Sequence, residues 1–390
     1  MQVSNRIEGL NGGGSDGWDV FYRARAMVNA GEPVTELTIG EHDIRTDPSI
    51  LAAMNAAAVS GHTGYASVPG VAALRDAVAL RLTERTGMAT TRDNIVITPG
   101  GQAGLFAAHM ALCDAGDVAL YCDPYYATYP GTIRGAGAVP RVVTTRPEAA
   151  FQPSYADIAE QAEGARSLLV NTPNNPTGVV YDHQTVEGVA RACCDFDLWC
   201  ISDEVYDTQV WEGAHMSPRA MEGMAARTLV VGSMSKSHAM TGSRVGWVAG
   251  PAEVIEHMVN LATHTTYGVP GYIQDAALFA LNEGPELESR VGAPFERRRR
   301  LAQGLLAGQN VVKLVPSGGA MYLMLDCRAT GLSGEEFANR LLDTHRIAVM
   351  PGESFGAAAA GHIRVAMTVE DAAFEAALAT ILTFAKELAA

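Results

Sequence analysis

Lysine is scarce in this chain of 390 residues. Three lysines, Lys236, Lys313 and Lys386, stand against 25 arginines, which is the total of 28 basic residues less three. The net charge of −15 argues against a nucleic-acid-binding protein, because such proteins normally present a basic surface. The one basic run, Arg297–Arg300, lies in a helical pattern, and we expect it to form a solvated helix face whose arginines pair with acids.

Long apolar runs and paired cysteines are also missing. No apolar run is long enough to span a membrane, and the first residues lack the basic-then-apolar pattern of a signal peptide. The six cysteines contain no C-x-x-C pair, which favours a reduced, intracellular setting. We therefore expect a soluble, cytoplasmic protein that binds neither nucleic acid nor membrane, and we assign no metal ligands.

Two stretches before residue 90 have apolar residues at helical spacing. This spacing predicts helices over residues 47–61 and 71–87. Asp47 or Pro48 stands near the start of the first helix, and Gly87 is a typical stop for the second.

The rhythm changes after these helices, because short apolar runs then alternate with helical stretches. Such alternation predicts an α/β fold with a mostly parallel sheet that helices cover on both faces. Near residue 285 the alternation breaks, and a long helix and a separate α+β segment follow. We expect a large domain of residues 46–284 and a smaller α+β domain of residues 1–45 and 285–390.

Polar residues gather directly after the apolar runs. In open parallel sheets the carboxyl ends of the strands form the edge where ligands bind, so several polar strand ends predict one large site. Turn chemistry would explain any one of these motifs alone, but it explains the Lys and the Asp among them poorly. The motifs are TPGGQ (98–102), DPYY (123–126), NTPNNPTG (171–178), SDEVYD (202–207) and SMSKS (233–237).

Lys236 differs from the other two lysines in its setting. A solvated surface position suits Lys313 and Lys386, whereas Lys236 follows the strand-like run TLVVGS. Partial burial beside Arg244 would disfavour the charged form of the Lys236 amine, as a Schiff-base lysine requires. The nearby hydroxyls of Ser233 and Ser235, together with Arg244, would hold a phosphate dianion.

Asp203 ends another strand-like run and has two interpretations. It is either a cap or loop aspartate, or a buried carboxylate that keeps a pyridinium nitrogen protonated so that the ring accepts electrons. The two are equally good taken alone, and Lys236 on a neighbouring strand end favours the second.

Two glycine-rich stretches differ in their meaning. Gly100 and Gly101, with Gln102 opening a helix, present backbone N–H groups at a helix N-terminus, which binds anions. The stretch Gly12–Gly17 matches G-x-G-x-x-G literally, but no strand precedes it. We interpret it as an N-terminal loop and not as a dinucleotide site.

Three of these motifs, NNPTG, SDEVY and SMSKSHAMTGSRVGW, resemble the class I and II aminotransferases, which are fold-type I enzymes of the aspartate aminotransferase superfamily that depend on pyridoxal 5′-phosphate. The resemblance extends along most of the chain. LTIGEHDIRTDPSI, GHTGYASVPGVAALRDAVA, PGESFG and HIRVAM look like further segments of that family. It implies a seven-stranded, mostly parallel sheet between helices, a smaller α+β domain, and a transaminase that exchanges an amino group between an amino acid and a 2-oxo acid.

The resemblance also implies roles for single residues at the cofactor. Lys236 binds the cofactor aldehyde as a Schiff base and then moves the proton, and Asp203 pairs with the pyridine nitrogen. Tyr126 stacks on the cofactor ring, and the alternative, Tyr125, packs in the core. The remaining cofactor contacts are Tyr206 and Asn175 at the ring hydroxyl, and Ser233, Ser235, Arg244 and the Gly100–Gln102 backbone at the phosphate.

Three further implications concern the substrate and the assembly. Arg364 binds the substrate α-carboxylate, helped by Asn175 and the Gly40 backbone, and HIRVAM independently suggests a buried strand arginine that needs a carboxylate partner. A structural ion pair with a core acid fits Arg364 less well. Tyr65 reaches the phosphate of a neighbouring subunit, so a homodimer is expected. The Asp123–Pro124 and Asn175–Pro176 bonds are candidates for cis geometry.

The chain departs from the family at two positions near the substrate. His42 replaces a proline that is common there, and it either shapes substrate choice or is an ordinary loop histidine. Gln102 stands where some relatives that act on acidic substrates have a lysine. This favours neutral or aromatic amino acids over strictly acidic ones.

Two other functions remain as alternatives. Carbon–sulfur β-lyases share every motif above, because the same carbanion can expel a β-substituent. A regulator that senses the cofactor without catalysis would usually carry an N-terminal DNA-binding domain, and about 45 residues precede the large domain here.

Overall fold

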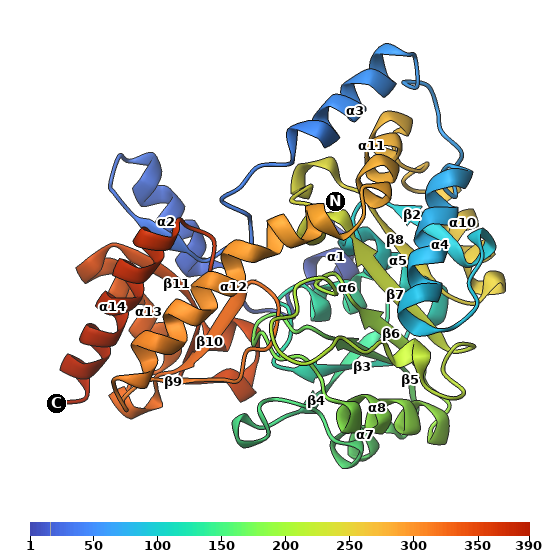
Figure 1. Cartoon of the computed structure of the whole chain (residues 1–390). Helices are drawn as coiled ribbons and strands as arrows, with labels where there is room; N and C mark the ends of the chain where they lie inside the picture. Colours follow the sequence, from blue (N-terminus) through green and yellow to red (C-terminus); the bar gives the residue numbers. More distant parts are fainter. Residues whose placement is uncertain (16) are drawn as a thin grey trace.

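The larger of two β-sheets forms the centre of the molecule (Figure 1). The computed structural model describes residues 1–15 and 17–390. The strand order of the larger sheet is β2-β8-β7-β6-β5-β3-β4, and among the described strands β8 alone runs antiparallel to its neighbours. The predicted mostly parallel sheet of seven strands is therefore confirmed. The strands are β2 (Ile95–Thr98), β3 (Val118–Asp123), β4 (Val139–Thr144), β5 (Ala165–Asn171), β6 (Trp199–Asp203), β7 (Thr228–Ser233) and β8 (Gly246–Ala249).

Helices pack on both faces of this sheet because successive strand residues point to opposite sides. In β2, Val96 packs with α5, α6 and α10, whereas Ile95 and Ile97 pack with α3, α4 and α11. Helices α7 and α8 cover a third cluster over β3–β6. Both faces being buried explains why the strands are continuous apolar runs. These helices are α3 (Pro48–Val59), α4 (Ala72–Thr86), α5 (Gly101–Leu112), α6 (Tyr129–Gly135), α7 (Tyr155–Ala162), α8 (His183–Asp195), α10 (Ala252–Thr263) and α11 (Gly271–Asn282).

The smaller sheet has the strand order β1-β11-β12-β10-β9 and lies beside the large one. In Figure 1, α12 leads from the part of the molecule that holds the large sheet to the part that holds the smaller one. Its first strand comes from the N-terminal residues and pairs in parallel with β11. The predicted domain limits, 46–284 against 1–45 with 285–390, stay a prediction. The elements are β1 (Thr35–Leu37), β9 (Lys313–Leu314), β10 (Tyr322–Asp326), β11 (Ile347–Pro351), β12 (His362–Ala366), α2 (Asp19–Asn29), α12 (Pro285–Ala307), α13 (Gly334–His345) and α14 (Asp371–Leu388).

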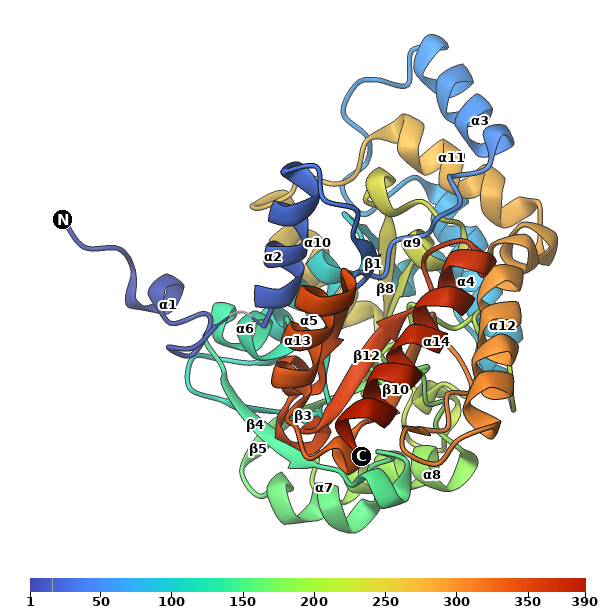
Figure 2. The ribbon, with the colours of Figure 1, turned by 90° about the vertical axis from the view of Figure 1, so that its left-hand side faces the viewer.

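Both helices predicted before residue 90 are present. The side chain of Asp47 caps α3 by accepting from the Ser49 N–H, and Gly87 ends α4 with a φ of 70°. Near the N-terminus, α1 (Asn5–Glu8) lies against α6 (Figure 2). The Gly12–Gly17 stretch includes residue 16, which lies outside the described residues. The first described strand, β1, begins only at Thr35.

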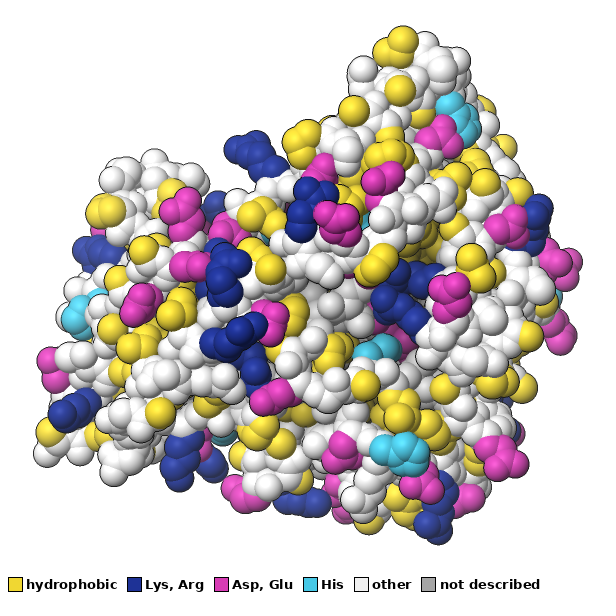
Figure 3. Space-filling model, viewed as in Figure 1, with side chains coloured by type: hydrophobic (Ala, Val, Ile, Leu, Met, Phe, Trp, Pro, Cys, Tyr) yellow, Lys and Arg dark blue, Asp and Glu magenta, His cyan; other side chains and the backbone are white. Residues whose placement is uncertain are grey.

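The run Arg297–Arg300 lies within α12, and all four side chains pair with acids as predicted. The predicted solvated face is wrong for Arg298 and Arg299, which are 3% and 5% exposed. Successive residues of a helix point about 100° apart, so four neighbours cannot share one face. Elsewhere on the surface shown in Figure 3, acidic and basic side chains are intermingled.

Three X-Pro bonds are cis: Asp123–Pro124 and Asn175–Pro176, as predicted, and Thr172–Pro173 in addition. All six cysteines are free. None of the described helices has both the length and the apolar character that a membrane crossing requires. The described residues contain no group of three or more His, Cys, Asp or Glu side chains placed to hold a metal.

Candidate active site

A cavity of about 470 Å³ lies where the carboxyl ends of β5, β6 and β7 meet the N-terminus of α5 and the second sheet. This is the edge at which open parallel sheets bind ligands. The cavity brings together most of the residues predicted from the sequence. Those that line it are Gly40, Gly101, Gln102, Tyr126, Asn175, Asp203, Tyr206, Ser233, Ser235, Lys236, Arg244 and Arg364.

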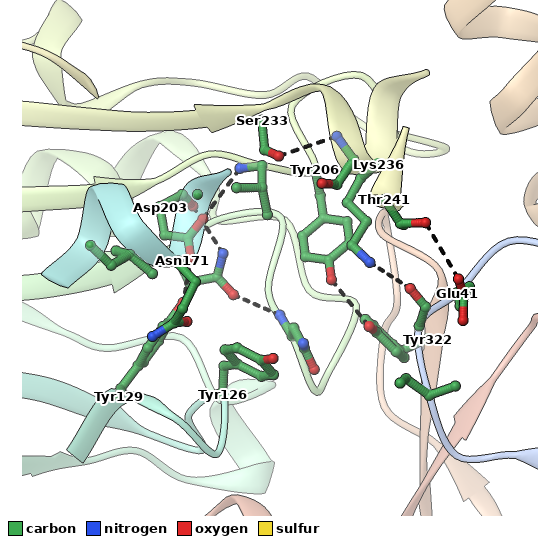
Figure 4. A pocket seen from close by; sticks show the side chains of 18 of the residues that line it. Glu41, Tyr126, Tyr129, Asn171, Asp203, Tyr206, Ser233, Lys236, Thr241 and Tyr322 are labelled. Atoms are coloured by element: carbon green, nitrogen blue, oxygen red, sulfur yellow. Dashed lines mark hydrogen bonds between the residues drawn. The ribbon is translucent and has the colours of Figure 1, made fainter. Parts of the chain in front are cut away.

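Lys236 lies one turn beyond β7, in the short helix α9 (Met234–Ser237). Ser233 caps this helix by accepting from the Ser235 N–H at 3.1 Å. The Lys236 amine points into the cavity and donates a hydrogen bond to the carbonyl of Gly40 (Figure 4). Burial lowers the pKa of this amine, and the positive charges of Arg364 and Arg244 lower it further. A lysine with a lowered pKa is suited to attack an aldehyde and to accept a proton.

Asp203 lies at the end of β6 and is 4% exposed. The Tyr129 hydroxyl donates to its Oδ2 at 2.7 Å, and the Val205 N–H donates to its Oδ1 at 3.3 Å. Burial raises the pKa of Asp203 to about 6, although both hydrogen bonds act in the opposite direction. A buried carboxylate with this pKa fits a protonated ring nitrogen, which would supply the opposite charge.

The N-terminus of α5 faces the cavity and has no side-chain cap. Gly100 precedes it with a φ of 81°, and a Cβ there would lie 2.5 Å from the guanidinium of Arg244. Glycine is therefore required for Arg244 to approach the helix end. Free N–H groups, a guanidinium and the hydroxyls of Ser233 and Ser235 form an anion site that fits a phosphate dianion.

Arg364 is 1% exposed in the middle of β12. Its guanidinium donates to Asn175 Oδ1 at 2.8 Å and to the Thr38 carbonyl, and it lies 4.4 Å from the ring centroids of both Tyr322 and Phe355. Its Nε has no hydrogen-bond partner among the described residues. A buried guanidinium with a donor left over and no carboxylate beside it fits the carboxylate of a ligand.

Several residues of this site were missed from the sequence, among them Tyr129, Asn171 and Tyr322, and also Trp18, Phe21, Tyr22 and Glu41. Asn171 donates to the Asp203 carbonyl at 2.9 Å and accepts from the Asn175 N–H at 2.7 Å, so it joins two of the predicted motifs. Tyr322 lies in an apolar strand and shares a hydrogen bond of 3.1 Å with Tyr206. The third tyrosine of DPYYATY was the one available signal for Tyr129.

The two adjacent tyrosines of DPYY lie in different places, and the stacking role expected of Tyr126 stays a prediction. Tyr126 lines the cavity and stands beside Tyr129 in Figure 4, with 5.8 Å between the ring centroids. Tyr125 lies outside the cavity lining and packs its ring against Tyr121 at 5.0 Å.

His42 contacts the backbone of the central lysine. Its Nε2 lies 3.1 Å from the Lys236 carbonyl, and its ring packs edge-on against Phe295 at 5.3 Å. Burial, reinforced by the charge of Lys236, lowers the pKa of His42 to about 3, so the ring is neutral and Nε2–H is the donor.

Tyr65 lies outside the cavity lining. Its side chain is 92% exposed and contacts the ring of Tyr267, 5.2 Å away. Its expected contact with a second subunit stays a prediction.

The fold together with Lys236, Asp203 and the anion site define an enzyme of fold type I that depends on pyridoxal 5′-phosphate. The family model "aminotransferase class I and II" matches residues 32–381, and the chain belongs to this family. It is therefore a transaminase.

Several relatives are similar along nearly the whole chain. The arginine–pyruvate transaminase of Pseudomonas aeruginosa is 40% identical over 371 residues, which are 95% of this chain and 94% of that protein. The aspartate/prephenate aminotransferase of Thermus thermophilus is 33% identical over 352 residues, 90% of each chain. Among solved structures, a double mutant of the Thermus thermophilus aspartate aminotransferase superposes with a TM-score of 0.92 at 32% identity and covers 99% of both chains.

Proposed function

We propose that this aminotransferase exchanges the amino group between a neutral or aromatic L-amino acid and a 2-oxo acid. The observation that carries the proposal is the aromatic wall of the cavity. Trp18, Phe21 and Tyr22 line the same cavity as Lys236 and Arg364. Aromatic faces favour apolar and aromatic side chains.

The basic side chains among the described lining residues are Lys236, Arg244 and Arg364. Their positions suit the aldehyde, the phosphate and the α-carboxylate, which leaves no fourth cation for an acidic side chain. Gln102 is engaged at both ends of its amide, with Thr132 Oγ1 at 2.8 Å and Thr128 Oγ1 at 3.0 Å. These contacts argue against strictly acidic donors.

Each residue would have a defined task in the reaction. Arg364 binds the α-carboxylate in a two-pronged contact, and Tyr126 fixes the plane against which the substrate lies. Lys236 Nζ, with its lowered pKa, takes the proton from Cα. When bound, the pyridinium ring supplies an acceptor for the electron pair that this proton leaves behind. Asp203 holds the negative charge that keeps the ring nitrogen protonated.

The test is a panel of donors and acceptors with the purified enzyme, scored for 2-oxo acid exchange. We expect phenylalanine, tyrosine or a neutral aliphatic amino acid to react with a higher kcat/KM than aspartate and glutamate. A preference for aspartate over every neutral donor would refute the proposal.

A basic donor such as arginine is a second candidate. Glu41 lines the cavity together with the aromatic residues, and its Oε1 accepts from Thr241 at 3.4 Å. A planar guanidinium both stacks on aromatic rings and pairs with carboxylates. The similarity to an arginine–pyruvate transaminase supports the same candidate. Arginine in the donor panel separates the two, and Glu41→Gln would then lower kcat/KM for arginine and not for phenylalanine.

The panel also separates transamination from β-elimination. Release of ammonia and pyruvate from cysteine-type donors without 2-oxo acid exchange would mean a β-lyase, and exchange without ammonia means a transaminase.

The proposed assembly is a homodimer in the cytoplasm, with Tyr65 serving the neighbouring site. The exposed rings of Tyr65 and Tyr267 support a partner contact, because large aromatic side chains are enriched at interfaces. Mixing the inactive Lys236→Ala variant with Tyr65→Ala and allowing subunits to exchange should restore activity. The mixed dimer then holds one complete site. Activity no higher than that of Tyr65→Ala alone would show that Tyr65 does not act across subunits.

A further inference from the structure

Asp123 connects the large sheet to the segment that precedes Arg364. It ends β3, and its side chain is 4% exposed. Its Oδ2 accepts from the Ala358 N–H at 3.2 Å, and the Ala357 N–H also stabilises the carboxylate. Both donors lie in the short helix η7 (Ala357–Ala359), which follows η6 (Gly352–Phe355). A residue of the large sheet therefore binds a backbone turn next to the smaller sheet.

The turn is shaped around this carboxylate. Gly356 has a φ of 120°, and a Cβ there would lie 2.0 Å from Asp123 Oδ1. A second link lies beside the first, because the Tyr125 N–H donates to the Phe355 carbonyl at 2.9 Å. Any other side chain at position 356 would meet both backbone strain and the carboxylate.

Phe355 continues this connection to the substrate-binding arginine. Its ring is fully buried, and the ring centroid lies 4.4 Å from Arg364 Cζ. The Tyr125 N–H holds the Phe355 carbonyl, and Asp123 holds the backbone two and three residues further on, at Ala357 and Ala358. On the other side, the chain from Asp123 leads through Tyr125 to Tyr126, which lines the cavity. Asp123 thus lies between the two groups that would orient the substrate.

We infer that Asp123 is a positioning residue, whose carboxylate fixes the 355–358 turn and through Phe355 sets the place of the Arg364 guanidinium. This rests on the proposed role of Arg364 as the α-carboxylate site. Asp123 touches neither substrate nor cofactor in this arrangement. Its loss weakens binding of the substrate carboxylate and leaves the amine end unaffected.

The effect depends on pH. Burial raises the pKa of Asp123 to about 6, against the two N–H donors. Among the described residues, the titratable groups that face it are Tyr121, Cys122 and Tyr125. The ordinary pKa values of tyrosine and cysteine lie well above 6 and burial raises each further, so all three are neutral near pH 6. Above pH 6 the ionised carboxylate accepts both N–H groups, and below pH 6 protonation weakens this acceptor. The positioning is therefore present above pH 6 and lost as pH falls through it.

The experiment follows the first half-reaction of the holoenzyme with L-alanine and with L-alaninamide, read from the change in cofactor absorbance. The methyl side chain fits any side-chain pocket, and the amide lacks the carboxylate. For Asp123→Asn at pH 8 we expect the apparent Kd for alanine to rise about fivefold to tenfold, as for loss of a charged hydrogen bond, with the Kd for alaninamide unchanged. The ratio of the apparent Kd for alanine in the variant to that in the wild type should shrink below pH 6.

The matched control is Asp117→Asn, the same change just before the other end of β3. Asp117 also accepts a backbone N–H, from Asp114 at 2.9 Å, and we expect wild-type values for both probes. An unchanged Kd for alanine in Asp123→Asn, or an equal loss for both probes, would overturn the inference. Arg364→Ala separates a failure of this inference about Asp123 from a failure of the proposed role of Arg364. If it leaves alanine binding unchanged, the proposed carboxylate site itself is wrong.

Discussion

The hydroxyl of Tyr129 donates a hydrogen bond of 2.7 Å to the buried Oδ2 of Asp203, and it thereby ties the start of α6 to the end of β6. The two residues are 74 positions apart in the chain. Burial raises the pKa of the Asp203 carboxyl, and this hydrogen bond lowers it. Tyr129 therefore helps to keep Asp203 ionised.

Replacing Tyr129 by Phe removes this donor and leaves the ring in place. The pKa of Asp203 then rises, so the acid limb of the kcat/KM profile moves to higher pH. At the pH optimum we expect a loss of about tenfold, as for a hydrogen bond to a charged group. The pH–rate profiles of both proteins check this, and an acid limb that stays in place would contradict it.

Asp203→Asn should stabilise the protein when the cofactor is removed. The folded-state pKa of Asp203, about 6, lies above the ordinary 3.8. The contribution of this carboxyl to the free energy of unfolding is therefore present below pH 4 and lost as pH rises through 6. The difference between 3.8 and about 6 corresponds to about 3 kcal/mol. Denaturant unfolding of the cofactor-free proteins at pH 8 should show a higher free energy of unfolding for the variant, and the value just given is the upper limit of this gain.

This gain in the free energy of unfolding should shrink toward pH 4, where Asp203 of the wild type is protonated and therefore neutral, like the asparagine of the variant. In the loaded enzyme the order reverses, because wild-type Asp203 gains the ring nitrogen as a charged partner. A cofactor-free variant that is less stable than wild type at pH 8 would argue against a buried, unpaired carboxylate.

Lys236→Ala should abolish turnover and the visible absorbance of the lysine-bound cofactor. The amine of Lys236 lies inside the cavity and has a lowered pKa, whereas Lys313 is exposed on β9. Lys313→Ala therefore serves as the control and should keep both signals. Transamination at wild-type rate by the Lys236 variant would show that another group performs the proton transfer.

His42→Gln should retain most activity, because a glutamine amide can donate to the Lys236 carbonyl in place of Nε2–H. His42→Ala removes the donor and should lower kcat about threefold to tenfold, the cost of one buried hydrogen bond. Neither change should move the pH profile between 5 and 9, since burial holds the pKa of His42 at about 3. A profile that shifts in His42→Gln would show that the histidine titrates during turnover.

Much of the fold and part of the site could be predicted because their signals are local. The alternation of apolar runs with helical stretches indicated the parallel sheet, and the polar residues after each run indicated its ligand-binding edge. Lys236 and Asp203 could be selected as candidates because each lies at or just after the end of such a run, and both line the cavity. Capping and stop residues such as Asp47 and Gly87 act within one turn of their own helix, so they too can be recognised in the sequence.

The arginine run shows where local pattern fails. Four consecutive arginines look alike in the sequence, but the buried Arg298 pairs with Asp43 and with the partly exposed Asp371, while Arg300 pairs on the surface with Glu296. The partners of Arg298 come from segments distant in the chain, whereas Glu296 lies one turn before Arg300 in the same helix. Burial depends on which side of α12 meets the second sheet.

The sequence by itself determined the order of the elements, and it indicated the two groups that we propose act at the cofactor and the proposed anion site at the start of α5, because each is set by neighbours within a few residues. The tertiary structure decided the rest. It placed Tyr129 on Asp203, Tyr322 and Phe355 against Arg364, and Asp123 under the turn at Gly356. These contacts join residues far apart in the chain, and their distances and burial exist only once the helices pack on the large sheet and the two sheets pack together.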